Sequence, residues 1–68
     1  MERINKRIRA FRKLRGLTQV ELAKKAGVFI SVLGKVERGT KKPDLILLEK
    51  LSNALDVDID ELTAGQRK

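Results

Sequence analysis

The sequence predicts an all-α fold, a compact domain of five short helices. Apolar residues recur at spacings of three and four along successive segments, and period-2 alternation bounded by turn residues is absent. The chain has 68 residues, which is the length of a single small domain. We therefore expect one domain over residues 1–68, in which residues 63–68 form a loose C-terminal tail.

The first helix is predicted from about Arg3 to Leu14. Its apolar residues share one helical face and are expected to be buried: Ile4, Ile8, Phe11 and Leu14. Gly16 follows as the left-handed residue that ends the helix. The basic residues of this helix fall off the apolar stripe, so we expect them to be exposed.

The second helix is predicted to begin at Thr18 and to end near Lys25. The Thr18 hydroxyl can accept the backbone N–H of Glu21, and the Glu21 carboxylate can accept the N–H of Thr18 in return. This arrangement is a capping box, and it marks a helix start. Gly27 supplies the tight turn that follows the helix.

The third helix is predicted from about Ile30 to Arg38, and Gly39 ends it. Phe29 stands where a Ser or Thr would normally cap the first turn, and this lost cap costs about 1 kcal/mol of stability. The inward residues of this segment are expected to be Val28, Val32, Leu33 and Val36.

The fourth helix is predicted to start after the cap Asp44 and to run to about Leu55. Its expected buried stripe consists of leucines at helical spacing: Leu45, Leu48, Leu51 and Leu55. This stripe leaves Ile46 and Leu47 at its margin.

A last short helix is expected after Asp58, whose carboxylate would form a second capping box with Glu61. Ile59 and Leu62 of this helix would close the core.

The charge of the chain is uneven along its length. Residues 1–42 contain 13 Lys/Arg and 3 Asp/Glu, a net charge of +10, whereas residues 43–68 contain 3 Lys/Arg and 6 Asp/Glu, a net charge of −3. A basic first half beside an acidic second half indicates one face that binds a polyanion.

The composition argues against several classes of function. The chain has no Cys and no His, which removes a thiol nucleophile and the usual zinc ligand sets. It has no Gly-rich phosphate loop, no calcium-loop spacing in its acidic segment, and no run of about 18 apolar residues that would span a membrane. We expect no metal, no cofactor, no small-molecule ligand and no enzymatic activity, in a cytoplasmic protein.

The second and third helices are separated only by the turn around Gly27. Helices joined so closely are expected to cross at a steep angle, so the second of the pair is pushed outward. An outward helix on a basic domain can enter the major groove of DNA, which makes sequence-recognising DNA binding the leading hypothesis.

Several short motifs together resemble a known family. They are Gly16-Leu17-Thr18-Gln19-x-Glu21-Leu22-Ala23, Gly27-Val28, Val36-Glu37-Arg38-Gly39, Pro43, Leu55-x-Val57 and Leu62. The pattern, over residues 4–62, resembles the phage-repressor/Cro (XRE) type of helix-turn-helix proteins. The resemblance implies a lambda-repressor-like domain of five helices that binds double-stranded operator DNA as a two-fold homodimer and regulates transcription, as a repressor or as an activator.

The resemblance also implies which residues contact DNA. The expected base contacts lie on the third helix: Ile30, Ser31, Gly34 and Lys35. The expected phosphate contacts are Gln19, Phe29, Arg38, Lys41 and Lys42. A lysine suits guanine O6 and N7, whereas an isoleucine offers only an apolar surface to a thymine methyl group.

Two further roles concern structure and assembly. The resemblance pairs Arg12 with Glu37 in an ion pair that holds the third helix against the first. Exposed apolar side chains near the fourth helix suggest a homodimer interface of Ile46, Leu47 and Ile59.

A protein-interaction module on the same fold is the alternative function. Phe29 and Ile30 are unusual at the start of a base-reading helix, and they would contact a partner protein in that case.

Overall fold

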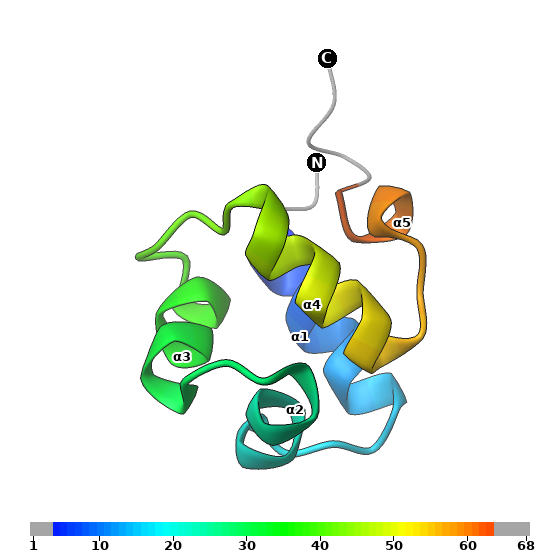
Figure 1. Cartoon of the computed structure of the whole chain (residues 1–68), viewed down its shortest axis with the longest axis horizontal. Helices are drawn as coiled ribbons and strands as arrows, with labels where there is room; N and C mark the ends of the chain where they lie inside the picture. Colours follow the sequence, from blue (N-terminus) through cyan, green and yellow to red (C-terminus); the bar gives the residue numbers. More distant parts are fainter. Residues whose placement is uncertain (1–3, 64–68) are drawn as a thin grey trace.

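The computed structural model of the chain describes residues 4–63, and these form five helices without a strand (Figure 1). The helices are α1 (Ile4–Leu14), α2 (Gln19–Ala26), α3 (Ile30–Arg38), α4 (Leu45–Leu55) and α5 (Ile59–Thr63). The predicted fold class is confirmed, and the helix bounds lie within one or two residues of the predicted ones. The predicted start at Arg3 and residues 64–68 of the predicted tail lie outside the described residues.

The helices pack around one apolar core to which all five contribute. In Figure 1, α1 and α4 cross near the middle, α2 and α3 lie to one side, and α5 lies at the other end. The largest side chains with almost no solvent exposure are Ile8, Leu22, Leu33, Leu51, Leu55, Leu62 and Val36. Burying each such side chain stabilises the fold by about 1.5–3 kcal/mol, so this shared core is what fixes the position of α3.

The helix starts follow local side-chain chemistry. The Thr18 hydroxyl accepts the Glu21 N–H at 3.1 Å, and the Glu21 carboxylate accepts the Thr18 N–H at 2.8 Å, which confirms the capping box of α2. Asp44 caps α4 by accepting the Leu47 N–H at 2.8 Å. The first turn of α3 has no side-chain cap at Phe29, as predicted.

The helix ends use left-handed residues. Gly16, Gly27 and Gly39 have φ of +72°, +72° and +82° and end α1, α2 and α3. At the end of α4 the same conformation is taken by Asp56, with φ of +58°. A residue with a Cβ pays a steric cost there that glycine avoids, so this turn must be held by other contacts.

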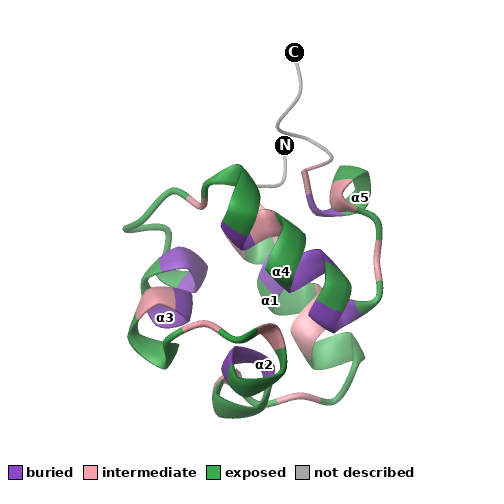
Figure 2. Ribbon diagram, in the orientation of Figure 1, coloured by how far each residue is buried: buried purple, intermediate pink, exposed green. Residues whose placement is uncertain are grey.

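Two expected buried side chains are exposed: Leu14 is 71% exposed and Leu45 is 63% exposed. Conversely, Leu47 is only 9% exposed and belongs to the core. The buried face of α4 runs through Leu47, Leu51, Ala54 and Leu55, which also have helical spacing. Because α4 begins with four apolar residues in a row, its periodicity fits either face, and packing against the other helices decides between them (Figure 2).

Two predictions for the C-terminal segment are wrong. The capping box between Asp58 and Glu61 is not formed within residues 4–63; the Asp58 backbone carbonyl, rather than its carboxylate, accepts the Glu61 N–H at 2.9 Å. Thr63, assigned to the loose tail, is the last residue of α5, and its hydroxyl donates to the Ile59 carbonyl at 3.1 Å.

Candidate nucleic-acid interface

Helix α3 has one buried face and one exposed face. Leu33 and Val36 are fully buried, whereas Ile30, Ser31 and Lys35 are exposed (Figure 2). Three of the four residues expected to contact bases therefore share the outward side of this helix.

The fourth expected base contact is misplaced. Gly34 is buried, and a Cβ built on it would lie 3.2 Å from Nη1 of Arg38 and 3.9 Å from Oε1 of Gln19. Because the Arg38 and Gln19 side chains cover it, Gly34 presents no surface to a base in this structure. Its small size lets those two side chains pack closely over α3.

The last turn of α3 is anchored by a buried carboxylate, that of Glu37, whose side chain is only 3% exposed. Arg12 of α1 donates to both of its oxygens, from Nε to Oε2 at 2.8 Å and from Nη2 to Oε1 at 3.1 Å. The ion pair inferred from the resemblance is thus present in the structure with bidentate geometry, which is the stronger form of such a pair.

Two further side chains complete this arrangement, which we call the Glu37 cluster: Asn5, Arg12, Gln19 and Glu37. Gln19 Nε2 donates to Glu37 Oε1 at 3.0 Å, and Asn5 Nδ2 donates to the Glu37 backbone carbonyl at 3.2 Å. Within residues 4–63 no buried side-chain nitrogen or oxygen lacks a hydrogen-bond partner. The cluster ties α1, α2 and α3 together, so the outward face of α3 is held rigidly.

The role of Asn5 was not predicted, because its contact is with a backbone atom 32 residues away. Gln19 was expected to bind a phosphate, but in this structure its amide nitrogen already donates one hydrogen bond to Glu37. A primary amide carries two N–H groups, so a phosphate contact by Gln19 stays a prediction that uses the second one.

Three basic residues line one cavity at the end of α3. Arg38, Lys41 and Lys42 line a shallow cavity of about 250 Å³ between the loop after α3 and the start of α1. All three residues are exposed. Exposed cations that line one cavity are suited to a phosphate group, and the phosphate contacts expected of them stay a prediction. Phe29 is 79% exposed and its side chain has no donor, so a phosphate contact at this position is left to its backbone N–H.

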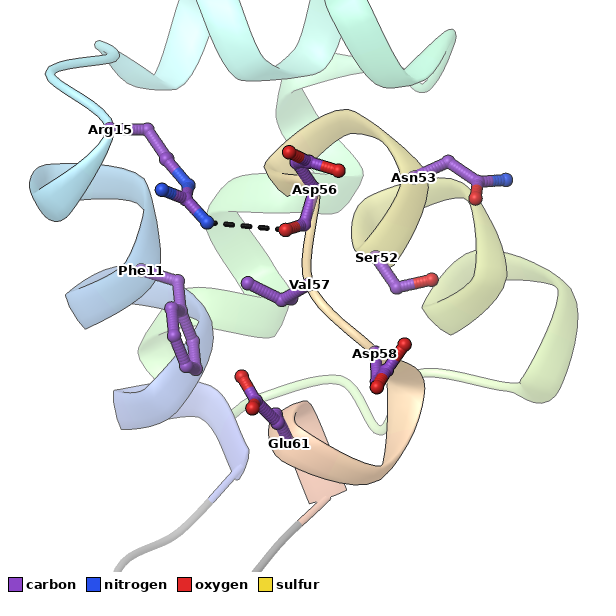
Figure 3. Close-up of a pocket in the computed structure, with 8 residues that line it drawn as sticks. All are labelled: Phe11, Arg15, Ser52, Asn53, Asp56, Val57, Asp58 and Glu61. Carbon is purple, nitrogen blue, oxygen red and sulfur yellow. Dashed lines mark hydrogen bonds between the residues drawn. The ribbon is translucent and has the colours of Figure 1, made fainter.

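Two arginines, Arg7 of α1 and Arg15 directly after it, donate to backbone carbonyls at another part of the molecule. Arg15 donates from Nε to the Leu55 carbonyl at 2.8 Å and from Nη2 to the Asp56 carbonyl at 3.1 Å, as Figure 3 shows for the second bond. Arg7 donates from Nε to the Glu61 carbonyl at 2.6 Å. These side chains satisfy carbonyls at the ends of α4 and within α5, where a cation is favourable. Arg7, which the sequence predicted to be exposed, is therefore half-buried, whereas Arg15 stays exposed while it donates these bonds.

The region around Arg15 is acidic. A cavity of about 390 Å³ beside it is lined in part by Asp56, Asp58 and Glu61, whose carboxylates surround the turn between α4 and α5 (Figure 3). This turn lies at the opposite end of the molecule from α3 in Figure 1. The charge asymmetry of the sequence is thus an asymmetry in space, with cations at α3 and carboxylates near α5.

The three residues expected at a dimer interface do not lie together. Ile46 lines a cavity of about 280 Å³ with Phe29, whereas Ile59 lines a different one of about 430 Å³ with Leu45. Leu47 is in the core, so its assignment to the interface is wrong.

Over residues 4–63 no helix is both long enough and apolar enough to span a bilayer. The same residues contain no group of three or more Asp or Glu side chains placed to hold a metal ion.

Comparison with known proteins identifies two relatives of similar sequence. YazB, an uncharacterized HTH-type transcriptional regulator of Bacillus subtilis, is 40% identical over 62 residues, which cover 91% of this chain and 90% of that protein. The regulator SinR of Bacillus subtilis is 43% identical over 60 residues, which cover 87% of this chain but only 54% of SinR. The chain therefore spans about half the length of SinR and nearly all of YazB.

Solved structures of such proteins match the fold. The crystal structure of SinR in complex with DNA has a TM-score of 0.84, with 43% identity over 87% of this chain and 95% of that one. The P22 c2 repressor, solved with a synthetic operator, has a TM-score of 0.87, with 34% identity over 96% of this chain and 98% of the other. The helix-turn-helix family model HTH_3 matches residues 8–62, which include Arg12, Gln19 and Glu37 of the cluster but not Asn5. The chain belongs to this helix-turn-helix family.

Proposed function

We propose that the chain is a transcriptional regulator that binds double-stranded DNA sequence-specifically, with α3 in the major groove. The observation that carries this proposal is the exposed face of α3, flanked by Arg38, Lys41 and Lys42 and fixed from behind by the Glu37 cluster. Direct readout requires a helix whose side chains are held in place before the DNA arrives, and a buried bidentate anchor supplies that rigidity. The DNA-bound forms of SinR and the P22 c2 repressor support the same arrangement.

Each part of this surface has its own task in the proposal. Ser31 and Lys35 contact base edges, and Lys35 suits a guanine. Arg38, Lys41 and Lys42 bind phosphates and set the position of the protein on the duplex without reading sequence.

The regulator is proposed to act as a two-fold homodimer on an operator with two half-sites about one helical turn apart. We assign this contact to the surface that runs along α4 to the α4–α5 turn, where Leu45, Val57 and Ile59 line one cavity. Leu45 is a large apolar side chain without cover, which is typical of an interface. Sedimentation of Leu45→Glu against the unaltered chain tests this contact: the variant should be a monomer at concentrations where the unaltered chain is a dimer.

We further propose that residues 1–68 act as one DNA-binding unit, as a repressor, in the cytoplasm and without catalytic activity. The protein-interaction alternative has less support, because it gives no role to the three cations at the end of α3.

Selection of bound duplexes from a random DNA pool tests the proposal directly. A two-fold symmetric consensus is the expected result. With three phosphate-binding cations on each subunit, the logarithm of the binding constant should fall with the logarithm of salt concentration at a slope of about −5. Enrichment of no sequence, or no binding at low salt, would contradict the proposal.

A further inference from the structure

The N-terminus of α3 carries apolar side chains that do not pack against the core. Phe29, the N-cap residue, is 79% exposed, and Ile30, the first helical residue, is 46% exposed. Neither belongs to the core or to the apolar side chains packed against it. Along α3 the first side chain that can form a hydrogen bond is that of Ser31.

This arrangement costs stability in the free chain. A Ser at the N-cap would accept a backbone N–H, and the hydrogen bond that Phe29 cannot make is worth roughly threefold to thirtyfold in the folding equilibrium. Two large apolar side chains also stay in water until something covers them. A position that weakens the free domain in both ways is a candidate for a contact made only in a complex.

The location says which contact. N-terminal residues of a recognition helix face base edges, and among the groups that those edges show in the major groove, the thymine 5-methyl is the apolar one. Neither Phe29 nor Ile30 can discriminate bases by donating or accepting a hydrogen bond through its side chain. Apolar contact is the readout left to them.

We propose that Phe29 and Ile30 recognise the 5-methyl group of a pyrimidine in each half-site, so that the operator carries a thymine opposite the start of α3. This inference rests on the proposed function and deepens it, because it names the chemical group that this end of α3 reads. Lys35 then reads a base by hydrogen bonding further along the same helix. The start of α3 thus discriminates bases by apolar contact, and its later part discriminates them by hydrogen bonds.

The test uses the operator obtained by selection, with one thymine at a time replaced by deoxyuridine. This change removes only the methyl group and leaves base pairing intact. One thymine of each half-site should be sensitive to this change. Its replacement in one half-site should lower the affinity about fourfold, and its replacement in both half-sites should lower it about fifteenfold, as expected for burial of one methyl-sized group per subunit. At the same position a 5-methylcytosine should bind more tightly than cytosine by a similar factor.

Variants assign the effect to the two side chains. In Phe29→Ala/Ile30→Ala the loss of DNA affinity on deoxyuridine substitution should shrink to less than about twofold, because the apolar side chains that contact the methyl group are gone. Leu14→Ala is the matched control, since Leu14 is an exposed apolar residue of another helix, and it should keep the full loss. Thermal unfolding of each variant checks that its fold is intact.

Three outcomes separate the possibilities. Selection without a consensus contradicts the proposed function itself. A consensus whose binding is indifferent to deoxyuridine at every thymine overturns the methyl proposal alone. A methyl effect that persists unchanged in Phe29→Ala/Ile30→Ala also overturns it, and would return these residues, with the neighbouring Ile46, to the role of a protein contact.

Discussion

The two ends of this domain hold similar side chains and use them differently. At the α3 end Arg38, Lys41 and Lys42 are exposed and line one shallow cavity. At the α4–α5 end Arg7 and Arg15 donate to backbone carbonyls. The first group contributes to an external electrostatic surface, and the second replaces missing helix hydrogen bonds.

This difference shows that the net charge of +7 does not by itself define a binding surface. An arginine that satisfies a helix end and sits beside carboxylates contributes stability to the fold and little positive potential. The basic face of the molecule is therefore smaller than the count of Lys and Arg suggests, and it is concentrated at the end of α3. Arg12 of the Glu37 cluster belongs to neither group, because it is half-buried and paired with a buried carboxylate.

The largest expected effect on stability comes from breaking the Arg12–Glu37 ion pair. Arg12→Met leaves the Glu37 carboxylate buried without its cation, and breaking a buried pair in this way costs about 3–5 kcal/mol. Urea denaturation should show most of the stability of a domain this small lost, and DNA binding should fall because less protein is folded. The double variant Arg12→Met/Glu37→Leu removes both charges and should recover part of the loss. Equal stability of Arg12→Met and the unaltered chain would contradict the anchoring role.

The next effect should appear at the α3 end. Lys41→Ala/Lys42→Ala removes two phosphate contacts per subunit, and four per dimer, so the magnitude of the salt slope should fall by about 3.6. The free energy of unfolding should change by less than about 0.5 kcal/mol, since both residues are exposed. The matched control is Lys24→Ala/Lys25→Ala, which removes the same charge from exposed positions of α2 and should leave the slope unchanged. Equal slopes for the two variants would show that only net charge matters.

Replacing Arg15 at the α4–α5 end should give the reverse result, with stability lowered and DNA binding unaffected by the lost charge. Arg15→Met removes two hydrogen bonds to the end of α4, with an expected loss of about 1 kcal/mol in unfolding free energy. The salt slope of DNA binding should stay as it is. Arg38→Met is the counterpart at the α3 end, and it should change the slope and leave the stability. The comparison between the two ends fails if both variants behave alike.

The smallest effect should be a gain. Asp56→Gly relieves the left-handed conformation at the end of α4 and should stabilise the domain by about 0.5–1 kcal/mol in thermal or urea unfolding. The salt slope of DNA binding should be unchanged, because Asp56 lies at the opposite end of the molecule from α3 and makes no phosphate contact in the proposal. Destabilisation would mean that the Asp56 side chain makes a contribution larger than its backbone strain.

Local features were predictable because their causes are close in sequence. The capping box of Thr18 and Glu21 spans three residues, and the turn at Gly27 depends on a single residue that tolerates positive φ. The outward face of α3 followed in the same way from helical periodicity. Phe29 was recognisable as an uncapped start from its residue type alone.

The failures share a different cause. Arg15 donates to a carbonyl 40 residues away and Arg7 to one 54 residues away. The residue type of a flexible basic side chain does not indicate which distant carbonyl it will reach. Gly34 was assigned to the DNA surface by the family resemblance, yet Arg38 and Gln19 cover it. The dimer assignment of Leu47 failed because α4 opens with four consecutive apolar residues, and periodicity could not select its buried face.

The sequence by itself determined the five helices, their caps and stops, the helix-turn-helix spacing and the excess of positive charge in the first forty-two residues. These follow from interactions within a few residues of the chain. Only the tertiary structure decided which leucine stripe of α4 is buried, which arginines serve helix ends, and how Asn5 and Gln19 join Arg12 around Glu37. Such outcomes depend on which distant segments pack together, because burial and carbonyl partners are set by the assembled core rather than by neighbours along the chain.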